Sequence, residues 1–354
     1  MKNFRCLLAF MLAAMPAYAS VDENLINEML TAVDSDYLQP VNNDELAING
    51  LQAITALDSD ILISKGSDKF YIYYKKQIKK IIPQPQNADN AAEWSRVMAK
   101  IADETAKWSD KVAQRDFELP DLMMKKITEK LDKFSHYYSE YDYSDDKDEN
   151  AIYTLYSDRK IDDVLYLRVR IFNKQTAKAV LGSLERSRPY SAVILDLRGN
   201  SGGILNEALK VADFFTDNEI ITYTSGKDGD NVHYYTSKDW RIYDGPMVVL
   251  VDGETASAAE VLAAGLQDQS RAKVVGTQTF GKGTIQNVIQ MSNGGKLVLT
   301  TEQFFTPSGK IIHQNGVIPD VCTAKDVEGA CKRESRLWDE SDIETAIKLL
   351  KNEI

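Results

Sequence analysis

Apolar positions recur at helical spacing in the first part of the chain. From residue 20 to about residue 140 they follow this pattern in segments such as LINEMLTAV, ELAINGLQAITAL and DLMMKKITEKL. Apolar residues three and four positions apart share one face of a helix. Pro83 and Pro85 interrupt the pattern between two helical groups. The sequence therefore predicts an N-terminal α-helical domain over residues 20–140.

From residue 164 onward, strands alternate with helices. SAVILDLR and MVVLVD are nearly continuous apolar runs, typical of strands covered on both faces of a sheet. Helical patterns follow each of them, and an NGG turn between TIQNVIQMS and KLVLTTEQFF predicts a hairpin. This alternation predicts an α/β layered core over residues 164–321. Residues 141–163 begin with an acidic run and are predicted as a solvated linker, and residues 322–354 as a C-terminal segment with a helix.

The first 19 residues have the features of a secretory signal peptide. Lys2 and Arg5 precede an apolar run, and Ala17, Tyr18 and Ala19 form a small-x-small triplet before Ser20. The run is shorter than the ~20 residues that span a bilayer. We expect cleavage after Ala19, no membrane span in the mature chain, and a periplasmic or secreted location.

Charge and cysteine content narrow the class of protein further. The formal net charge is −11, and removal of the two cations of the signal peptide makes it −13. Nucleic acid and anionic lipid need a basic footprint, so neither is expected as a partner. Cys6 leaves with the signal peptide, whereas Cys322 and Cys331 are nine positions apart. In an oxidising compartment this spacing favours a disulfide over a metal site.

The stretch GTQTFGKGT, Gly276 to Thr284, nearly matches a nucleotide-binding P-loop. Gly283 stands where a hydroxyl residue should hold Mg²⁺, and the residues after Lys282 alternate as a strand. A P-loop needs a helix at that point, because the helix N-terminus binds the phosphates. No nucleotide and no other cofactor is predicted.

Two serines compete as a possible nucleophile. Ser201 in RGNSGG has trypsin-like surroundings, but only His136 of the three histidines lies upstream, and the flanking strand and helix are the wrong architecture. Ser257 in ETASAAE stands at the turn from a buried strand into a helix. The Ala258 N–H there could bind an oxyanion, and the GNSGG turn could supply a second donor, because strand ends of an α/β sheet share one edge. Taken alone, Ser257 is better explained as a helix cap, the commonest role of a serine at a helix start.

A serine nucleophile needs a base, and histidine is scarce. Lys282 lies between Gly281 and Gly283, beside Phe280. A lysine acts as a base near pH 7 only when burial lowers its pKa from about 10.4. Serine with lysine is a recognised variant of the serine-hydrolase constellation. Taken alone, a lysine at this position is more often a solvated side chain.

Three motifs together carry a family resemblance. ILDLRGNSGGILNEALKVADFF, VVLVDGETASAAEVLAAGLQDQSRAKVVGTQTFGKGTIQ and LTTEQFFTPSGKIIHQNGVIPDV occur in that order. They resemble the core of the carboxy-terminal processing peptidases, also called tail-specific proteases. The resemblance covers residues 164–321 and implies a ClpP/crotonase-like core.

The resemblance implies a role for each matching residue. Ser257 would be the nucleophile and Lys282, 25 positions later, the base. Gln286 would orient the lysine ammonium, and the backbone N–H groups of Gly203 and Ala258 would form the oxyanion hole. Glu260 is a weaker candidate for a supporting role. The implied activity is that of an exported serine endopeptidase that cleaves unfolded or C-terminal protein segments without a metal.

The sequence departs from the family at one point. Most members carry a PDZ domain between the helices and the core, and such a domain needs about 80 to 90 residues. Only about 25 separate Tyr138 from Val164, so no PDZ domain is predicted. Residues 20–140 would instead provide a docking platform, a lid or a homodimer surface, with a structural cap as the alternative. A catalytically silent peptide-binding or scaffold protein on the same fold is the alternative function.

Overall fold

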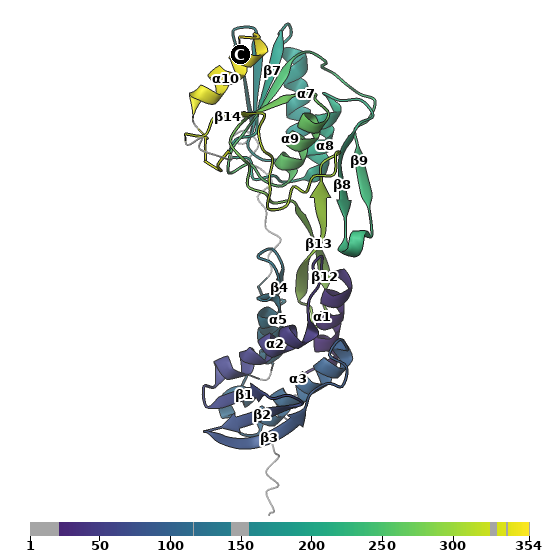
Figure 1. Cartoon of the computed structure of the whole chain (residues 1–354), viewed down its shortest axis with the longest axis vertical. Coiled ribbons are helices and arrows are strands. Elements are labelled where there is room, and N and C mark those ends of the chain that lie inside the picture. Colours follow the sequence, from purple (N-terminus) through teal and green to yellow (C-terminus); the bar gives the residue numbers. More distant parts are fainter. Residues whose placement is uncertain (1–20, 116, 143–155, 326–330, 338, 354) are drawn as a thin grey trace, which may run out of the picture. The chain divides into compact units, whose positions relative to one another are not determined.

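The computed structural model describes residues 21–115, 117–142, 156–325, 331–337 and 339–353 (Figure 1). The predicted signal peptide lies outside these residues. The chain divides into two compact units. Unit 1 takes residues up to 35, residues 41–143 and residues 289–298, and unit 2 takes residues 36–40, 144–288 and 299–354. Within the described ranges, no helix is both long enough and apolar enough to cross a membrane.

Unit 1 contains the predicted helices. They are α1 (Glu23–Asp36), α2 (Asn43–Leu57), α3 (Ala91–Ala106), α4 (Asp110–Ala113) and α5 (Leu119–Thr128). Asn42, Asn90 and Ser109 cap three of them, because each side chain accepts a hydrogen bond from an N–H of the first turn. The apolar faces that the sequence predicted are buried in this unit, as at Ile54 and Met98.

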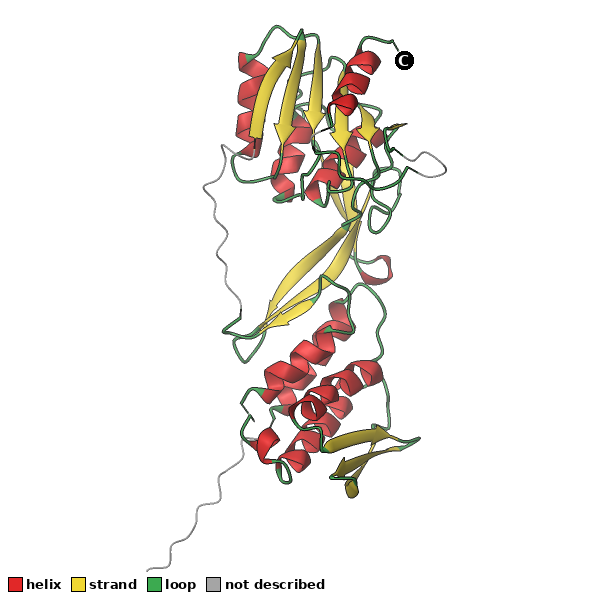
Figure 2. Ribbon diagram, turned by 90° about the vertical axis from the view of Figure 1, so that its left-hand side faces the viewer, coloured by secondary structure: helices red, strands yellow, loops and turns green. Residues whose placement is uncertain are grey.

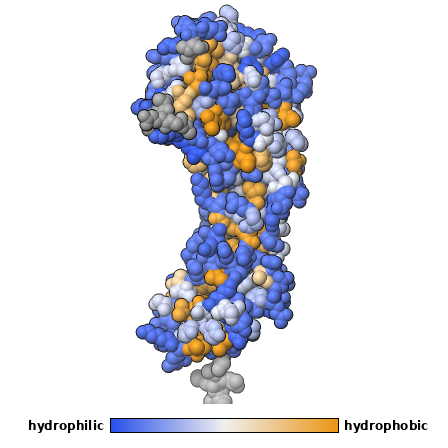
Figure 3. All heavy atoms as spheres, in the orientation of Figure 1, coloured by the Kyte–Doolittle hydropathy of each residue, from blue (hydrophilic) through white to orange (hydrophobic). Residues whose placement is uncertain are grey.

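The prediction of an α-helical domain over residues 20–140 is wrong in two segments, the short strand at residues 136–138 and a larger one. Residues 61–83 form an antiparallel sheet of three strands, β1 (Ile61–Lys65), β2 (Lys69–Tyr74) and β3 (Gln77–Pro83). Lys75 and Lys76 both adopt positive φ, 49° and 64°, in the two-residue turn between β2 and β3. Such turns usually carry Asn-Gly or a similar pair, and a pair of lysines is not a recognisable turn signal. Leu62, Ile78 and Ile81 remain about half exposed, and apolar surface is visible over these strands (Figure 3).

Unit 2 is built on a sheet of six strands in the order β14-β11-β10-β7-β6-β5. The strands are β5 (Tyr156–Ile161), β6 (Val164–Val169), β7 (Ala192–Asp196), β10 (Met247–Val251), β11 (Lys273–Gly276) and β14 (Val321–Cys322). All neighbours are parallel except β5, which pairs antiparallel with β6. The predicted linker is therefore too long at its C-terminal end, because residues 156–161 pair with the core as a strand. Most of the remaining linker lies outside the described residues.

Helices cover both faces of this sheet (Figures 1 and 2). They are α7 (Thr176–Arg186), α8 (Leu205–Asp213) and α9 (Ala258–Asp268) on one face, and α10 (Glu340–Leu350) on the other. Alternate residues of β10 enter the two cores: Val249 and Val251 face the first three helices, while Val248 and Leu250 face α10. Covering on both faces explains the continuous apolar runs in the sequence, and the prediction of a mixed α/β core is confirmed.

A second sheet contains the predicted hairpin. Its strands are β8 (Ile220–Ser225), β9 (His233–Thr236), β12 (Thr284–Gln290) and β13 (Lys296–Phe305), with β4 (His136–Tyr138) beside the tip of β13. Cys322 and Cys331 are joined by a disulfide, as their spacing predicted. The strand β12 follows Lys282 directly, which confirms that no P-loop helix begins there.

Candidate active site

The carboxyl ends of β7, β10 and β11 lie side by side, because these strands are parallel neighbours. Leu250 pairs with Asp196, and Val251 pairs with Gly276, so the three strands leave the sheet at a similar level. The segments that follow are here called the glycine turn (residues 197–204), the serine turn (residues 252–257) and the lysine loop (residues 277–283). We expected the glycine turn and the serine turn to lie at one edge of the sheet, and this strand order places the ends of their strands there.

A buried aspartate shapes the serine turn. Asp252 has no exposed surface, and its Oδ1 accepts hydrogen bonds from the N–H groups of Glu254 and Thr255, both at 3.1 Å. The Thr255 hydroxyl donates to the Leu197 carbonyl at 2.9 Å, which ties this turn to the glycine turn. Ser257 then enters α9 with φ 55° and ψ −122°. A non-glycine residue rarely adopts such a conformation, and backbone strain of this kind concentrates at functional sites.

The glycine turn lies against Ser257. The Asn200 carbonyl accepts from the Ala256 N–H at 2.8 Å, and the buried Asn200 side chain accepts from the Gly202 N–H at 2.8 Å. Gly202 has φ 102°, and a Cβ built on it would lie 2.7 Å from the Cβ of Ser257. Only glycine therefore fits at position 202, and its absent side chain leaves room for the serine.

Two backbone N–H groups beside Ser257 remain available. Phe172 donates its N–H to the Gly202 carbonyl, and Ile204 donates its N–H to the Phe172 carbonyl, both at 2.8 Å. In a parallel bridge of this kind, the N–H of the intervening Gly203 points to the other side. Ala258 is the first residue of α9, so its N–H has no acceptor within the helix. No group in the described part of the chain accepts a hydrogen bond from either N–H.

Two glycines fix the lysine loop against the segment 312–314. The Gly281 carbonyl accepts from the Gln314 N–H at 2.9 Å, and a Cβ built on Gly283 would lie 2.3 Å from the His313 nitrogen. Close approach of backbone to backbone is the reason that both neighbours of Lys282 are glycine. The Lys282 side chain itself is partly exposed. In the free protein this side chain is therefore not enclosed in a water-poor pocket.

Replacing Gly283 with alanine is expected to lower the free energy of unfolding by about 1–3 kcal/mol, because the added Cβ meets backbone that cannot move aside. Gly182→Ala in α7 is the matched control, because its Cβ would meet only the flexible end of Arg186. We expect that variant to be neutral or slightly more stable. Urea unfolding of the two variants measures the difference, and equal stabilities would contradict the close approach at Gly283.

One carboxylate joins the serine turn to the lysine loop. Glu260, in the first turn of α9, has no exposed surface. Its Oε2 accepts from the Ser257 N–H at 2.8 Å and from the Lys282 N–H at 2.9 Å. Its Oε1 accepts from the Gly281 N–H at 2.6 Å and from the Thr279 hydroxyl. The backbone nitrogens of Ser257 and Lys282 can lie no farther apart than the sum of the two Oε2 distances.

Burial raises the pKa of Glu260, and the four hydrogen bonds that it accepts act in the opposite direction. An ionised carboxylate is the side chain that can accept four hydrogen bonds without donating any. The family resemblance made Glu260 only a weaker candidate for a supporting role, and a glutamate three positions after a serine is also the ordinary signal of a capped helix. Its bonds to the lysine loop come from a segment about 20 positions away along the chain, which no local pattern reveals.

Gln286 stands on β12, on the lysine side of the site. Its Nε2 donates to the hydroxyls of Thr284 and Thr300, at 2.9 and 3.1 Å. The amide is thereby oriented, and its carbonyl oxygen is the end that remains for accepting a hydrogen bond. Among the described residues, no group of three or more His, Cys, Asp or Glu side chains is placed to hold a metal ion.

The comparisons with known proteins match the part of the chain that carries this sheet and these loops. Residues 163–323, a little less than half of the chain, match the model described as Peptidase family S41. The matched segment coincides closely with the core predicted from the sequence.

Curated relatives are carboxyl-terminal processing proteases. The "Carboxy-terminal-processing protease" of Bartonella bacilliformis is 35% identical over 193 residues, which are 52% of this chain and 44% of the relative. The "Carboxyl-terminal-processing protease" of a Picosynechococcus species is 35% identical over 173 residues, 48% of this chain and 42% of the relative. The match thus spans less than half the length of these relatives.

Solved structures give a weaker likeness. The "Photosystem II D1 C-terminal processing protease" aligns with a TM-score of 0.49 at 20% identity, over 87% of this chain and 96% of that chain. A lipoprotein from Streptococcus agalactiae aligns with the same TM-score at 16% identity, over 90% and 99%.

Proposed function

We propose that this protein is an exported serine endopeptidase that cleaves unfolded or C-terminal protein segments with a dyad of Ser257 and Lys282. The observation that carries the proposal is the bonding of both backbones to Glu260. A shared buried anchor fixes the distance between the two segments, and fixed geometry is what a nucleophile and its base require. The S41 domain and the processing proteases among its relatives support a peptidase of this type.

In this mechanism, the Ser257 Oγ attacks the carbonyl carbon of the scissile peptide bond while the neutral amine of Lys282 accepts the hydroxyl proton. The negative charge that forms on the carbonyl oxygen is bound by the N–H groups of Gly203 and Ala258. The α9 N-terminus adds a partial positive charge at the same place. Lys282 then passes its proton to the leaving amine, and water hydrolyses the acyl-enzyme.

Two further groups complete the proposal. The Gln286 carbonyl oxygen orients the Lys282 ammonium, because its amide nitrogen is already bound to two threonine hydroxyls. Lys282 is partly exposed in the free protein, so the bound substrate segment itself excludes water from the lysine. The core is proposed to have the ClpP/crotonase-like arrangement.

Export, recruitment and assembly belong to the same proposal. The disulfide between Cys322 and Cys331 supports an oxidising compartment. Unit 1 exposes apolar side chains on its small sheet, which supports a role in docking substrate without a PDZ domain or in forming a homodimer. We propose no nucleic-acid partner, because the chain is strongly acidic.

Incubation of the mature protein with unfolded casein tests the proposed activity. We expect fragments from the wild type in the presence of a chelator and none from Ser257→Ala. Ser201→Ala is the matched control, because this exposed serine belongs to the glycine turn and has no part in the mechanism. Cleavage that survives in Ser257→Ala, or that disappears with the chelator, would assign the chemistry elsewhere.

Acidification is expected to lower activity through Glu260. A protonated carboxyl becomes a donor at one oxygen and no longer accepts from all four partners, so the two backbones lose their common anchor. The pKa of Glu260 is raised in the folded protein. The protonation of Glu260 therefore adds to the free energy of unfolding at low pH, and this addition is lost as pH rises through the raised pKa.

Activity and stability should consequently separate on the acidic side. We expect kcat/KM to fall on acidification while the stability contribution of Glu260 increases. Parallel pH profiles of kcat/KM and urea unfolding measure the two. Activity that fell only where the protein unfolds would contradict this role of the carboxylate.

A further inference from the structure

A short C-terminal segment crosses all three segments of the candidate site. Residues 331–336, here called the C-terminal strap, run from Cys331 to Arg336. The Glu334 carbonyl accepts from the Gly253 N–H at 2.7 Å in the serine turn, and from the Thr277 hydroxyl at 2.8 Å in the lysine loop. One carbonyl of the strap therefore bonds to both the serine turn and the lysine loop.

The serine turn has a glycine where the strap crosses it. A Cβ built on Gly253 would lie 2.9 Å from the Glu334 nitrogen and 3.0 Å from its carbonyl oxygen. The strap continues to Arg336, whose N–H donates to Oδ2 of the buried Asp252 at 2.9 Å. Asp252 also holds the N–H groups of the serine turn, so the strap and this turn share one carboxylate.

Arg333 makes the second link to the lysine loop. Its Nε donates to the Thr279 carbonyl at 2.7 Å, and its Nη2 donates to the Gln314 carbonyl. Gln314 in turn donates its N–H to Gly281. The planar guanidinium thus bridges the backbone carbonyl of Thr279, in the lysine loop, and that of Gln314, which is bonded to this loop, and a flexible ammonium group cannot do so.

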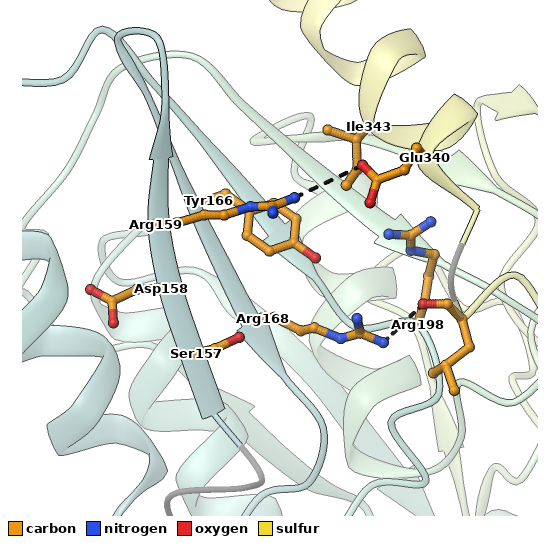
Figure 4. Close-up of a pocket in the computed structure, with 9 residues that line it drawn as sticks. Ser157, Asp158, Arg159, Tyr166, Arg168, Arg198, Glu340 and Ile343 are labelled. Atoms are coloured by element: carbon orange, nitrogen blue, oxygen red, sulfur yellow. Dashed lines mark hydrogen bonds and ion pairs between the residues drawn. The ribbon is translucent and has the colours of Figure 1, made fainter.

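Both ends of the strap are anchored. At the N-terminal end, Cys331 is bonded to Cys322, and Cys322 pairs with Gly276 at the end of β11. At the C-terminal end the anchor is a cluster of arginines. The buried Arg198 donates to the Arg336 carbonyl at 3.2 Å. Arg168, which Figure 4 labels near Arg198, donates to the Leu337 carbonyl at 3.0 Å.

The arginine anchor is itself held by buried ion pairs. Arg198 lies 2.7 Å from Asp196 and 3.0 Å from Asp342, and both carboxylates have no exposed surface. Arg336 lies 3.1 Å from Asp342. Removing one partner of such a network leaves a buried charge without compensation. This end is therefore a permanent attachment, whereas the disulfide is an attachment that a reductant can open.

We propose that the C-terminal strap positions the lysine loop against the serine turn, and that the Cys322–Cys331 disulfide makes peptidase activity sensitive to thiols. The inference rests on the proposed function. A dithiol reductant supplies two electrons and two protons: the Cys322–Cys331 bond breaks, each sulfur becomes a thiol, and the reductant is oxidised to its own disulfide. Of its two end anchors the strap then keeps only the arginine cluster, so the hydrogen bonds of Arg333 and Glu334 no longer hold a segment that is fixed at both ends.

The test uses the full mature chain with a fluorogenic peptide, with and without dithiothreitol. Reduction is expected to lower kcat by at least about tenfold with KM changed by less than about twofold, because a misplacement of 1 Å can cost on the order of 100-fold in rate. Removal of the reductant and reoxidation restores kcat. The variant with Cys322→Ser and Cys331→Ser has the low kcat and does not respond to dithiothreitol.

Arg333→Ala tests the positioning role without touching the disulfide. We expect kcat to fall with KM little changed, and partial recovery in Arg333→Lys. Ser335→Ala is the matched control, because this exposed side chain lies in the same strap and should leave kcat unchanged. Hydrogen exchange of the reduced protein should be faster at residues 277–283 and unchanged in β6 and β7.

Retention of full kcat by the reduced wild type and by Arg333→Ala would overturn the inference. Faster exchange in β6 and β7 would also overturn it, because reduction would then unfold the core rather than release the strap. The proposed function fails by a different result, namely cleavage by Ser257→Ala in the oxidised protein.

Discussion

Replacing Lys282 with alanine is expected to lower kcat for peptide cleavage by at least about 10⁴-fold, because removal of one member of a serine-hydrolase constellation has effects of this order. Ser257→Ala should fall to the same level. The double variant should be no worse than either single variant, because the two groups act as one unit.

A control variant at a second lysine distinguishes the effect of losing the base from the effect of losing a positive charge. Lys310 is exposed on the same unit, so Lys310→Ala removes a cation without removing the proposed base and should keep kcat. Substrate binding should change little in all of these variants, so KM distinguishes a catalytic loss from misfolding. Additive losses in the double variant, or a Lys282→Ala enzyme with near-normal kcat, would remove the dyad from the mechanism.

Glu260→Gln is expected to have the second largest effect, on both activity and stability. Glu260 now accepts hydrogen bonds from four donor groups. In the glutamine variant, the amide NH₂ group would face two of these four donors and could not accept from them. A buried donor left without an acceptor costs about 1–3 kcal/mol, so two of them should lower the free energy of unfolding by about 2–6 kcal/mol. We also expect kcat to fall by about 100-fold or more, because the Ser257 and Lys282 backbones lose their shared acceptor.

The matched control for Glu260→Gln is Glu254→Gln. Glu254 is exposed on the serine turn, so its change to glutamine should leave stability and kcat near those of the wild type. Urea unfolding and steady-state kinetics measure both effects. An unfolding free energy for Glu260→Gln equal to that of Glu254→Gln would contradict the four-acceptor role of Glu260.

The spacing of apolar residues and the alternation of strand and helix patterns predicted the sheet core well. The runs SAVILDLR and MVVLVD became β7 and β10 because helices cover both faces. Parallel neighbours then had to bring their carboxyl ends together, which is why the glycine turn and the serine turn could be paired from sequence alone. The sheet at residues 61–83 was missed because its two-residue turn is made by lysines rather than by asparagine and glycine.

Long-range contacts set the limit of prediction for the site. The Glu260 bonds to the lysine loop and the strap contacts of Glu334 join residues that are 19 to 81 positions apart. No periodic pattern in the sequence encodes such pairs, because each pair depends on which loops lie side by side at the edge of the sheet. The glycines gave the one local hint: Gly253, Gly281 and Gly283 each stand where another backbone comes close.

The most direct test of the account is intact-mass spectrometry of the enzyme during turnover of an activated peptide ester. We predict a transient acyl adduct on Ser257 in the wild type, and no such adduct within the same time in Lys282→Ala. An adduct on another residue, or equal acylation of Ser257 when Lys282 is absent, would contradict the proposal that these two residues act together.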